Sequence, residues 1–151
     1  MPVSRGGPVR LSTRSRYAAR ALGELVRQGG EDAPVMMRKL AERQQVSKRY
    51  LDNIFATLRV AGLIRTTRGA AGGYMLNRPA ETITLLQVVE ALDGDLDLVE
   101  CVAPDFVCER KGRCAPYVVW CDASAALQDA LRKVDLGTLA KMELQDCSED
   151  G

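Results

Sequence analysis

Residues 47–76 of the chain read SKRYLDNIFATLRVAGLIRTTRGAAGGYML. The first half of this stretch places apolar side chains at helical spacing. Ser47 stands before them, where an N-cap is expected, and Gly62 stands just past the expected helix end. After Gly62 the pattern changes, because the runs at 63–67 and 74–76 are typical of short strands joined by a glycine-rich turn. The stretch therefore predicts a helix followed directly by a β-hairpin.

Two further helices are expected before this stretch. Ser12 and Thr13 are N-cap candidates for the first, and residues 36–43 form a short second helix. A helix, a short helix, a tight turn, a longer helix and a Gly-tipped hairpin together make a winged helix-turn-helix, so the predicted fold is mainly α with a small β-hairpin wing. We expect residues 11–80 to form this DNA-binding domain, behind a flexible basic arm at residues 1–10.

The remainder of the chain divides into four predicted segments. They are a connecting helix at 81–100, a cysteine loop at 101–116, a dimerisation helix with a short packing helix at 117–145, and a disordered tail at 146–151. Thr84 is expected to cap the connecting helix and Pro116 to occupy the first position of the long helix. Thr138 is expected to cap the short last helix.

The long helix carries an apolar stripe that one small domain cannot bury completely. Its members are Tyr117, Trp120, Cys121, Ser124, Leu127, Leu131 and Val134. We expect the stripe to be buried by pairing with the same helix of a second chain, which predicts a homodimer. Packing against the first helix of the same chain is the alternative, and both can occur on different edges of the helix.

The net charge of +1 conceals two opposed halves. Residues 1–79 carry 15 Lys or Arg and 5 Asp or Glu, a net charge of +10, whereas residues 80–151 carry 6 and 15, a net charge of −9. This asymmetry indicates one half that faces nucleic acid. The chain has no His, which excludes His-based catalysis and His-ligated metals, so an enzyme is not expected.

The chain shows no membrane signal. No apolar run approaches the ~18–20 residues that span a bilayer, and the basic N-terminus lacks the apolar core of a signal peptide. A cytoplasmic protein without a membrane partner is therefore expected. In that compartment cysteines more often bind metal or respond to redox conditions than form a disulfide framework.

The start of the third expected helix, which Ser47 caps, carries the residues expected to meet DNA bases. A recognition helix places its N-terminal residues at base edges of the major groove. These residues are Ser47, Lys48, Arg49, Tyr50 and Asp52. Lys48 and Arg49 can donate to guanine or phosphate, whereas Asp52 only accepts and could select a cytosine amino group. Arg68 lies where the wing begins and can enter the minor groove.

A second group of basic residues is expected to contact phosphates and to fix the register on the duplex. Its members are Arg14, Arg16, Arg38, Lys39 and Arg59. The alternative for each single charge is a solvated helix face, and for Tyr50 it is a mainly core position. Taken together, the +10 excess in this motif favours a double-stranded DNA operator. With two-fold symmetry, the operator is expected to be pseudo-palindromic.

Three cysteines form the second motif. Cys101, Cys108 and Cys114 are spaced C-x6-C-x5-C, and Cys121 follows seven residues after the third. Structural zinc sites usually present close cysteine pairs two to four residues apart, so zinc is the less natural ligand here. Loops of this length can wrap an iron–sulfur cluster, which thiolates hold. Three unligated thiols, and Cys121 as a small apolar residue beside Trp120, are the alternatives.

Several of these stretches occur together, in the same order, in a known family. RLSTRSRYAARAL, the long stretch from VSKRYL to YMLNRP, ITLLQVVEALDG, the three cysteines and DLGTLAKM resemble the IscR-type winged-helix regulators, whose relatives include NsrR and RirA. The resemblance covers about residues 10–143. It implies a bacterial dimeric transcription regulator with one cluster per subunit, most simply [2Fe–2S]. The family's cluster ligands map onto Cys101, Cys108 and Cys114, its recognition-helix acid onto Asp52 and its wing arginine onto Arg68.

The chain departs from that family at the fourth cluster ligand. IscR proteins have a His three residues after the third cysteine, where this chain has Tyr117, and they have five residues in the first gap where this chain has six. Some relatives use an N-terminal carboxylate, where this chain has Arg16. The candidates are therefore Cys121, a carboxylate such as Glu24, or an exogenous group, whereas Cys147 is expected to be a bystander.

The combined hypothesis is a dimeric regulator that senses iron–sulfur supply, redox state or nitric oxide through a Cys-ligated [2Fe–2S] cluster. The alternatives are a metal-free thiol redox sensor and a zinc-binding DNA-binding protein.

Overall fold

A computed structural model of the chain describes residues 11–142. The expected basic arm, the tail and Cys147 therefore lie outside the described residues. The order of elements is α1 (Thr13–Arg27), α2 (Met37–Gln44), α3 (Lys48–Val60), β1 (Ile64–Thr67), β2 (Gly73–Leu76), the short 3-10 turn η1 (Ala80–Thr82), α4 (Leu85–Asp93), the turns η2 (Glu100–Val102) and η3 (Lys111–Arg113), α5 (Ala115–Arg132) and α6 (Leu136–Lys141). The mainly α winged helix-turn-helix is confirmed.

Local capping chemistry sets most of the helix starts. The Ser12 hydroxyl accepts from the Ser15 N–H at 3.1 Å, and Ser47 accepts from the Tyr50 N–H at 3.1 Å. Thr84 and Gln87 form a reciprocal capping box at the start of α4. At the other end of α3, Gly62 has a φ of 78°, a left-handed conformation that an L side chain rarely adopts. These expected boundaries are confirmed.

The last helix starts with a different cap from the expected one. Asp135 caps α6, because its carboxylate accepts from the Thr138 N–H at 2.7 Å and from the Thr138 hydroxyl at 3.0 Å. Thr138 is therefore a donor in the first turn, and its expected role as the cap was wrong. Pro116 is the second residue of α5 rather than the first, since the helix begins at Ala115.

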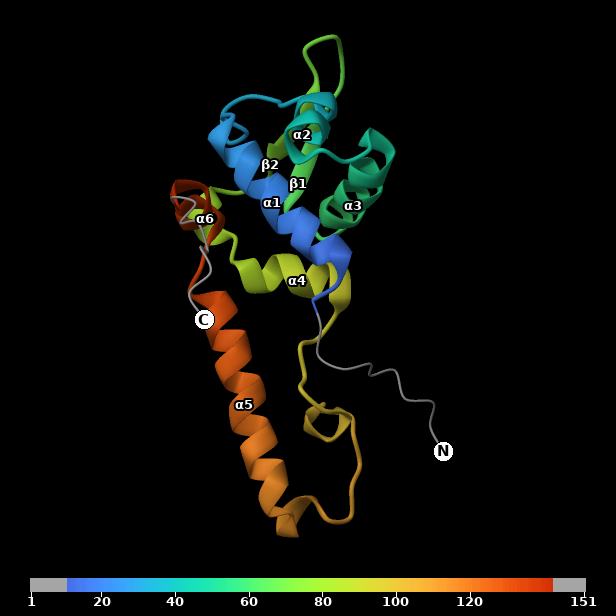
Figure 1. The fold of residues 1–151 in the computed structure, drawn as a ribbon, viewed down its shortest axis with the longest axis vertical. Coiled ribbons are helices and arrows are strands. Elements are labelled where there is room, and N and C mark those ends of the chain that lie inside the picture. The colour runs from blue at the N-terminus through green and yellow to red at the C-terminus, as the bar shows by residue number, and fades with distance from the viewer. Residues whose placement is uncertain (1–10, 143–151) are drawn as a thin grey trace, which may run out of the picture.

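The wing is a two-stranded antiparallel hairpin that is held against the helices. Ile64 pairs with Leu76 and Thr66 with Tyr74. On its other edge, β2 forms an isolated bridge between Tyr74 and Val35, in the segment before α2. Figure 1 shows the hairpin loop projecting past α2 at the far end of the winged-helix body from α5.

The main core lies among the helices of the winged-helix body and includes one residue from the C-terminal end. Leu22, Leu40, Ile54 and Phe55 are fully buried there, and so is Leu136 of α6. The helix α6 contacts α1, although more than a hundred residues separate their starts. The core of the winged-helix body is therefore completed by a helix from the C-terminal part of the chain.

The long helix α5 leaves this body and packs on α4 rather than on α1. Leu86, Val89 and Leu96 form a second small core, against which Leu131 of α5 packs. Figure 1 shows α5 running away from α4, with the cysteine loop at its distant end. The alternative of packing against the first helix was therefore wrong, because α6 occupies that place beside α1.

Candidate nucleic-acid interface and cysteine loop

The N-terminus of α3 presents its basic side chains to solvent. Ser47 ends a tight connection from α2 in which Gln45 adopts a left-handed conformation with a φ of 54°. The Lys48 and Arg49 side chains that follow are exposed. The Ser47 oxygen is used as the helix cap, while its O–H stays able to donate to a phosphate. This end of α3 therefore combines the positive end of the helix dipole with two solvent-exposed cations.

Asp52 lies one turn into α3 and is held by two partners. The Lys48 ammonium donates to Oδ2 at 2.7 Å, and the Tyr74 hydroxyl donates to Oδ1 at 3.4 Å. The hydrogen bond to Asp52 raises the pKa of Lys48 above its ordinary value. Burial, and next the Asp52 charge, raise the pKa of Tyr74, so its hydroxyl stays a protonated donor. The recognition helix and the wing are thus joined at this carboxylate.

Tyr50 is half-buried and does not project freely from α3. Its ring meets that of Tyr17 on α1 edge-on, with the ring centroids 5.7 Å apart. The Arg20 guanidinium lies 5.3 Å from the centre of the Tyr17 ring. Tyr50 therefore helps to seat α3 on α1 and keeps only part of its surface for DNA.

Arg14 has a structural role that the sequence did not indicate. One of its terminal nitrogens donates to the Thr57 hydroxyl at 3.0 Å and to the Asn53 carbonyl at 3.4 Å, both on α3. This guanidinium therefore braces α1 against the recognition helix. Arg16, in contrast, is exposed, and it donates to the hydroxyl of Thr13 on its own helix.

The other predicted phosphate contacts lie on exposed surface. Arg38 on α2 pairs with Glu42 at 3.1 Å, and both side chains are solvent-facing. Lys39 and Arg59 are also exposed. Arg68 follows β1 at the start of the wing loop and is exposed as well. These positions leave all four side chains accessible to DNA, Arg38, Lys39 and Arg59 for the predicted phosphate contacts and Arg68 for the predicted minor-groove contact.

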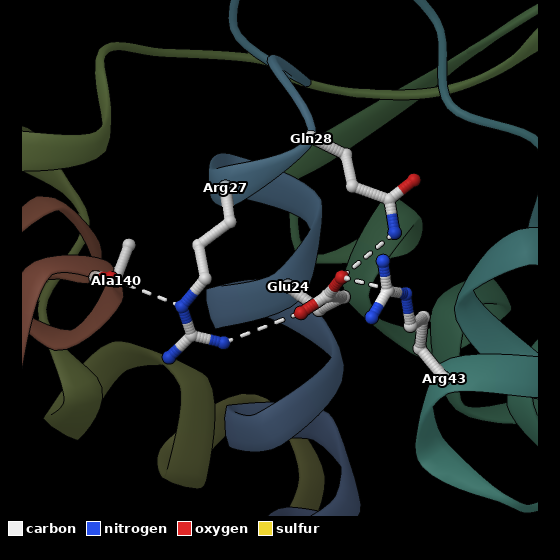
Figure 2. A network of polar contacts seen from close by, with 5 residues as sticks. All are labelled: Glu24, Arg27, Gln28, Arg43 and Ala140. Atoms are coloured by element: carbon white, nitrogen blue, oxygen red, sulfur yellow. Dashed lines mark hydrogen bonds and ion pairs between the residues drawn. The ribbon is translucent and has the colours of Figure 1, made fainter. Parts of the chain in front are cut away.

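Glu24, one candidate for the fourth cluster ligand, belongs to a polar network within the winged-helix body. Its carboxylate accepts from Gln28 at 2.8 Å and Arg27 at 3.3 Å, and it lies 3.8 Å from the Nε of Arg43 on α2. Figure 2 shows Arg27 also reaching the Ala140 carbonyl of α6, to which it donates at 3.0 Å. Glu24 therefore ties α1 to α2 and α6, and within one chain it is committed to that role.

The cysteine loop and the start of α5 together carry four half-buried, free thiols among the residues that the structure describes. Cys101 lies in η2, Cys108 in the loop, Cys114 at the N-cap of α5, and Cys121 in the second turn of that helix. These soft donors match an iron–sulfur cluster in chemistry. Their positions do not converge, however, because within residues 11–142 no three Cys, Asp or Glu side chains are grouped closely enough to hold a metal ion.

The base of the loop is fixed to α5. The buried Ser124 hydroxyl accepts from the Leu98 N–H at 2.9 Å, and the Gln128 amide donates to the Leu96 carbonyl at 3.1 Å. Lys111 lies 5.3 Å from the centre of the Tyr117 ring, which holds the far part of the loop beside the start of α5. The loop that carries Cys101, Cys108 and Cys114 is therefore anchored to α5 at its base and in its far part.

A winged helix with exposed cations on its third helix and wing is the architecture of a DNA-binding protein. The model of the Rrf2 family, described as an iron-dependent transcriptional regulator, matches residues 11–142. The chain belongs to the Rrf2 family of transcriptional regulators. In agreement with this membership, it is a regulator rather than an enzyme, and within residues 11–142 no helix is long and apolar enough to cross a membrane.

Individual relatives cover nearly the whole chain. Protein rrf2 of Nitratidesulfovibrio vulgaris is 38% identical over 93% of this chain and 90% of its own length. The HTH-type transcriptional regulator IscR of Erwinia tasmaniensis is 34% identical over 87% of this chain and 78% of its own. The solved structure of CymR, the global cysteine regulator of B. subtilis, has a TM-score of 0.71 and 30% identity, covering 87% of this chain and 95% of CymR.

Proposed function

We propose that this regulator binds a pseudo-palindromic DNA operator as a homodimer in the cytoplasm and reports the state of its cysteine loop. The observation that carries the DNA-reading part is the exposed N-terminus of α3, with Lys48 and Arg49 beside the paired Asp52. Arg68 on the wing extends the same basic half of the chain. Cations of this kind give affinity for phosphate, and the acceptor at Asp52 gives selectivity among bases.

The dimer is proposed to form through α5. Val118, Val119 and Trp120 are 59%, 57% and 39% exposed on this helix, which projects from the body. A second copy of the same helix would cover these side chains, and a two-fold axis would present two recognition helices to related half-sites. Analytical ultracentrifugation tests this step. A dimer is expected for the native chain, and Trp120→Glu should shift it towards monomer.

We propose that an iron–sulfur cluster is bound by the thiolates of Cys101, Cys108 and Cys114. The support is the donor set: three free thiols, half-buried, between the anchored base of the loop and the N-terminus of α5. Cys114 lies at that N-terminus, whose positive dipole end favours an anionic group. When bound, a [2Fe–2S] cluster supplies a redox-active group that can be lost or altered. Cys121 is the proposed fourth ligand from this chain.

A metal-free thiol sensor is the second candidate, and two observations favour it. The four thiols do not converge on a metal position within the described residues, and the fold is similar to that of CymR, the global cysteine regulator of B. subtilis. In this case two thiols would lose two protons and two electrons to an oxidant such as a peroxide and form a disulfide. Zinc held by the same thiols is the third outcome to be separated.

One experiment distinguishes these candidates. The full chain is purified without oxygen, its visible absorption is recorded, and iron, sulfide and zinc are measured per chain. A coloured protein with iron and acid-labile sulfide supports the cluster, and Cys101→Ala should abolish the colour. Cys121→Ala is the matched variant, and unchanged colour there removes this residue as a ligand. A colourless chain with stoichiometric zinc, or one without metal that forms a reversible disulfide with peroxide, contradicts the cluster.

A further inference from the structure

The carboxylate of Asp52 is held from two directions by different elements. Lys48, one turn earlier on α3, binds Oδ2 at 2.7 Å, whereas the Tyr74 hydroxyl reaches Oδ1 from strand β2 at 3.4 Å. The Asp52 side chain is 35% exposed, so part of it still faces solvent. A carboxylate has about four acceptor positions, and two donors leave the others for a DNA base.

The position of the Tyr74 hydroxyl is set by the fold around it. Its backbone N–H and carbonyl each form a 2.9 Å hydrogen bond with Val35, and its ring packs edge-on against the fully buried Phe55 at 5.1 Å between centroids. The preceding residue has to be glycine, because a Cβ on Gly73 would lie 2.3 Å from the Val35 carbonyl oxygen. The wing therefore delivers this hydroxyl to one place beside α3.

The two partners of Asp52 differ in how firmly they can hold it. The Lys48 side chain is 61% exposed and flexible, and DNA phosphates compete for its charge. Tyr74 is a rigid, half-buried donor, and its raised pKa keeps its proton in place at neutral pH. When DNA draws Lys48 away, Tyr74 remains as the donor that fixes the direction of the carboxylate.

We propose that Tyr74 is a positioning residue for sequence discrimination, holding the Asp52 carboxylate so that its free acceptor positions face a base in the major groove. The inference rests on the proposed function, in which the start of α3 lies in that groove. An oriented acceptor selects the cytosine amino group and rejects the acceptor oxygens of guanine and thymine. A carboxylate without the Tyr74 donor can turn towards Lys48 or solvent and loses this selectivity.

The test uses the full chain and synthetic duplexes. Selection from a pool of random duplexes identifies the preferred sequence of the native protein. Affinities are then measured by fluorescence anisotropy, at fixed salt, for that duplex and for duplexes with single base-pair changes. The variants are Tyr74→Phe, Asp52→Asn and the double variant, with Tyr17→Phe as the matched control. Phe keeps the ring contact with Phe55, and thermal melting verifies that each variant is folded.

Asp52→Asn is expected to identify the base pair that the carboxylate discriminates. At that base pair, Tyr74→Phe should reduce the discrimination ratio about fivefold, the size expected from one hydrogen bond of ordinary net strength, while affinity for random DNA changes less than about twofold. The double variant should match Asp52→Asn, because the hydroxyl acts only through the carboxylate. Tyr17→Phe should leave the ratio unchanged.

Several results would overturn the proposal. Equal weakening of all duplexes by Tyr74→Phe, additive with Asp52→Asn, would mean that the tyrosine only supports the wing. An Asp52→Asn protein with native discrimination at every base pair would show that the carboxylate is not a reading group. A native protein that selects no sequence would remove the proposed function itself, and this result is distinct because it appears before any variant is compared.

Discussion

Leu136 offers the sharpest test of how the two ends of the chain cooperate. Its side chain is fully buried in the core of the winged-helix body, although it belongs to α6. Its N–H donates to the Ile83 carbonyl at 2.9 Å, which fixes the start of α6 beside the segment before α4. Leu136→Ala removes three buried carbons, each worth about 0.8 kcal/mol, and leaves a cavity, so we expect a loss of about 3 kcal/mol of unfolding free energy.

Urea denaturation followed by far-UV circular dichroism measures this loss, at one protein concentration because dimer formation contributes to stability. Met142→Ala at the end of the same helix is the control. Its side chain is 55% exposed, and the change should stay within about 0.5 kcal/mol. A loss below about 1 kcal/mol for Leu136→Ala, with an unchanged denaturant slope, would refute the conclusion that α6 completes this core.

The remaining predictions concern the DNA-binding face and the α1–α4 junction. Ser47→Ala removes the cap of α3 and should lower the unfolding free energy by about 1 kcal/mol, measured by urea denaturation. Arg68→Ala should weaken operator binding by about 1–3 kcal/mol in fluorescence anisotropy. Asp52→Asn frees Lys48 and should strengthen binding to random DNA, with a log–log salt slope steeper by up to about 0.9 per subunit. Burial raises the pKa of Asp93, but hydrogen bonds at the start of α1 outweigh it, and the net pKa is lower than the ordinary value of 3.8. Its contribution to stability is present above that value and lost as pH falls through the folded-state pKa, so Asp93→Asn should flatten the acid limb of unfolding free energy against pH.

Matched variants separate these effects from general damage. Ser47→Thr keeps a capping hydroxyl and should retain most of the stability. Arg132→Ala and Asp129→Asn alter an exposed ion pair on α5, in the acidic half, and should leave affinity and salt slope unchanged. Asp95→Asn is the control for Asp93. An effect of equal size in a control variant would contradict the role given to its counterpart.

Local chemistry explains which parts of the fold the sequence could predict. Ser47, Thr84 and Gly62 act within one turn of their own position, so residue type and spacing were sufficient. The last helix shows the limit, because Asp135 and Thr138 are both capable caps three residues apart. Nothing in the local pattern says which residue adopts the extended conformation, and the contact of Leu136 with a distant core decides the helix start.

The candidate site also has features that the local sequence pattern predicts and features that depend on tertiary packing. The exposed cations of α3 follow from helical spacing and charge, whereas the thiols were identified from the spacing of the cysteines in a loop-like segment. Neither partner of Asp52 was predicted: Lys48, one turn earlier, was assigned only to DNA, and Tyr74 is 22 residues away and on another element. The GGY sequence before the second strand was the available signal, since glycine permits the close approach to Val35 that places the tyrosine. Arg14 was predicted only as a phosphate contact, because its α3 partners depend on tertiary packing.

The burial of Leu136 in the DNA-binding body also constrains when the protein becomes functional during its synthesis. Domains usually fold from the N-terminus as the chain is made, at roughly 5–20 residues per second. Here the recognition helix is complete early, but its supporting core stays open until residue 136 of 151 has left the ribosome. Nascent or truncated chains therefore expose the face of α1 that α6 covers. Synthesis yields a stable DNA-binding body only once the cysteine loop and α5 have already been made.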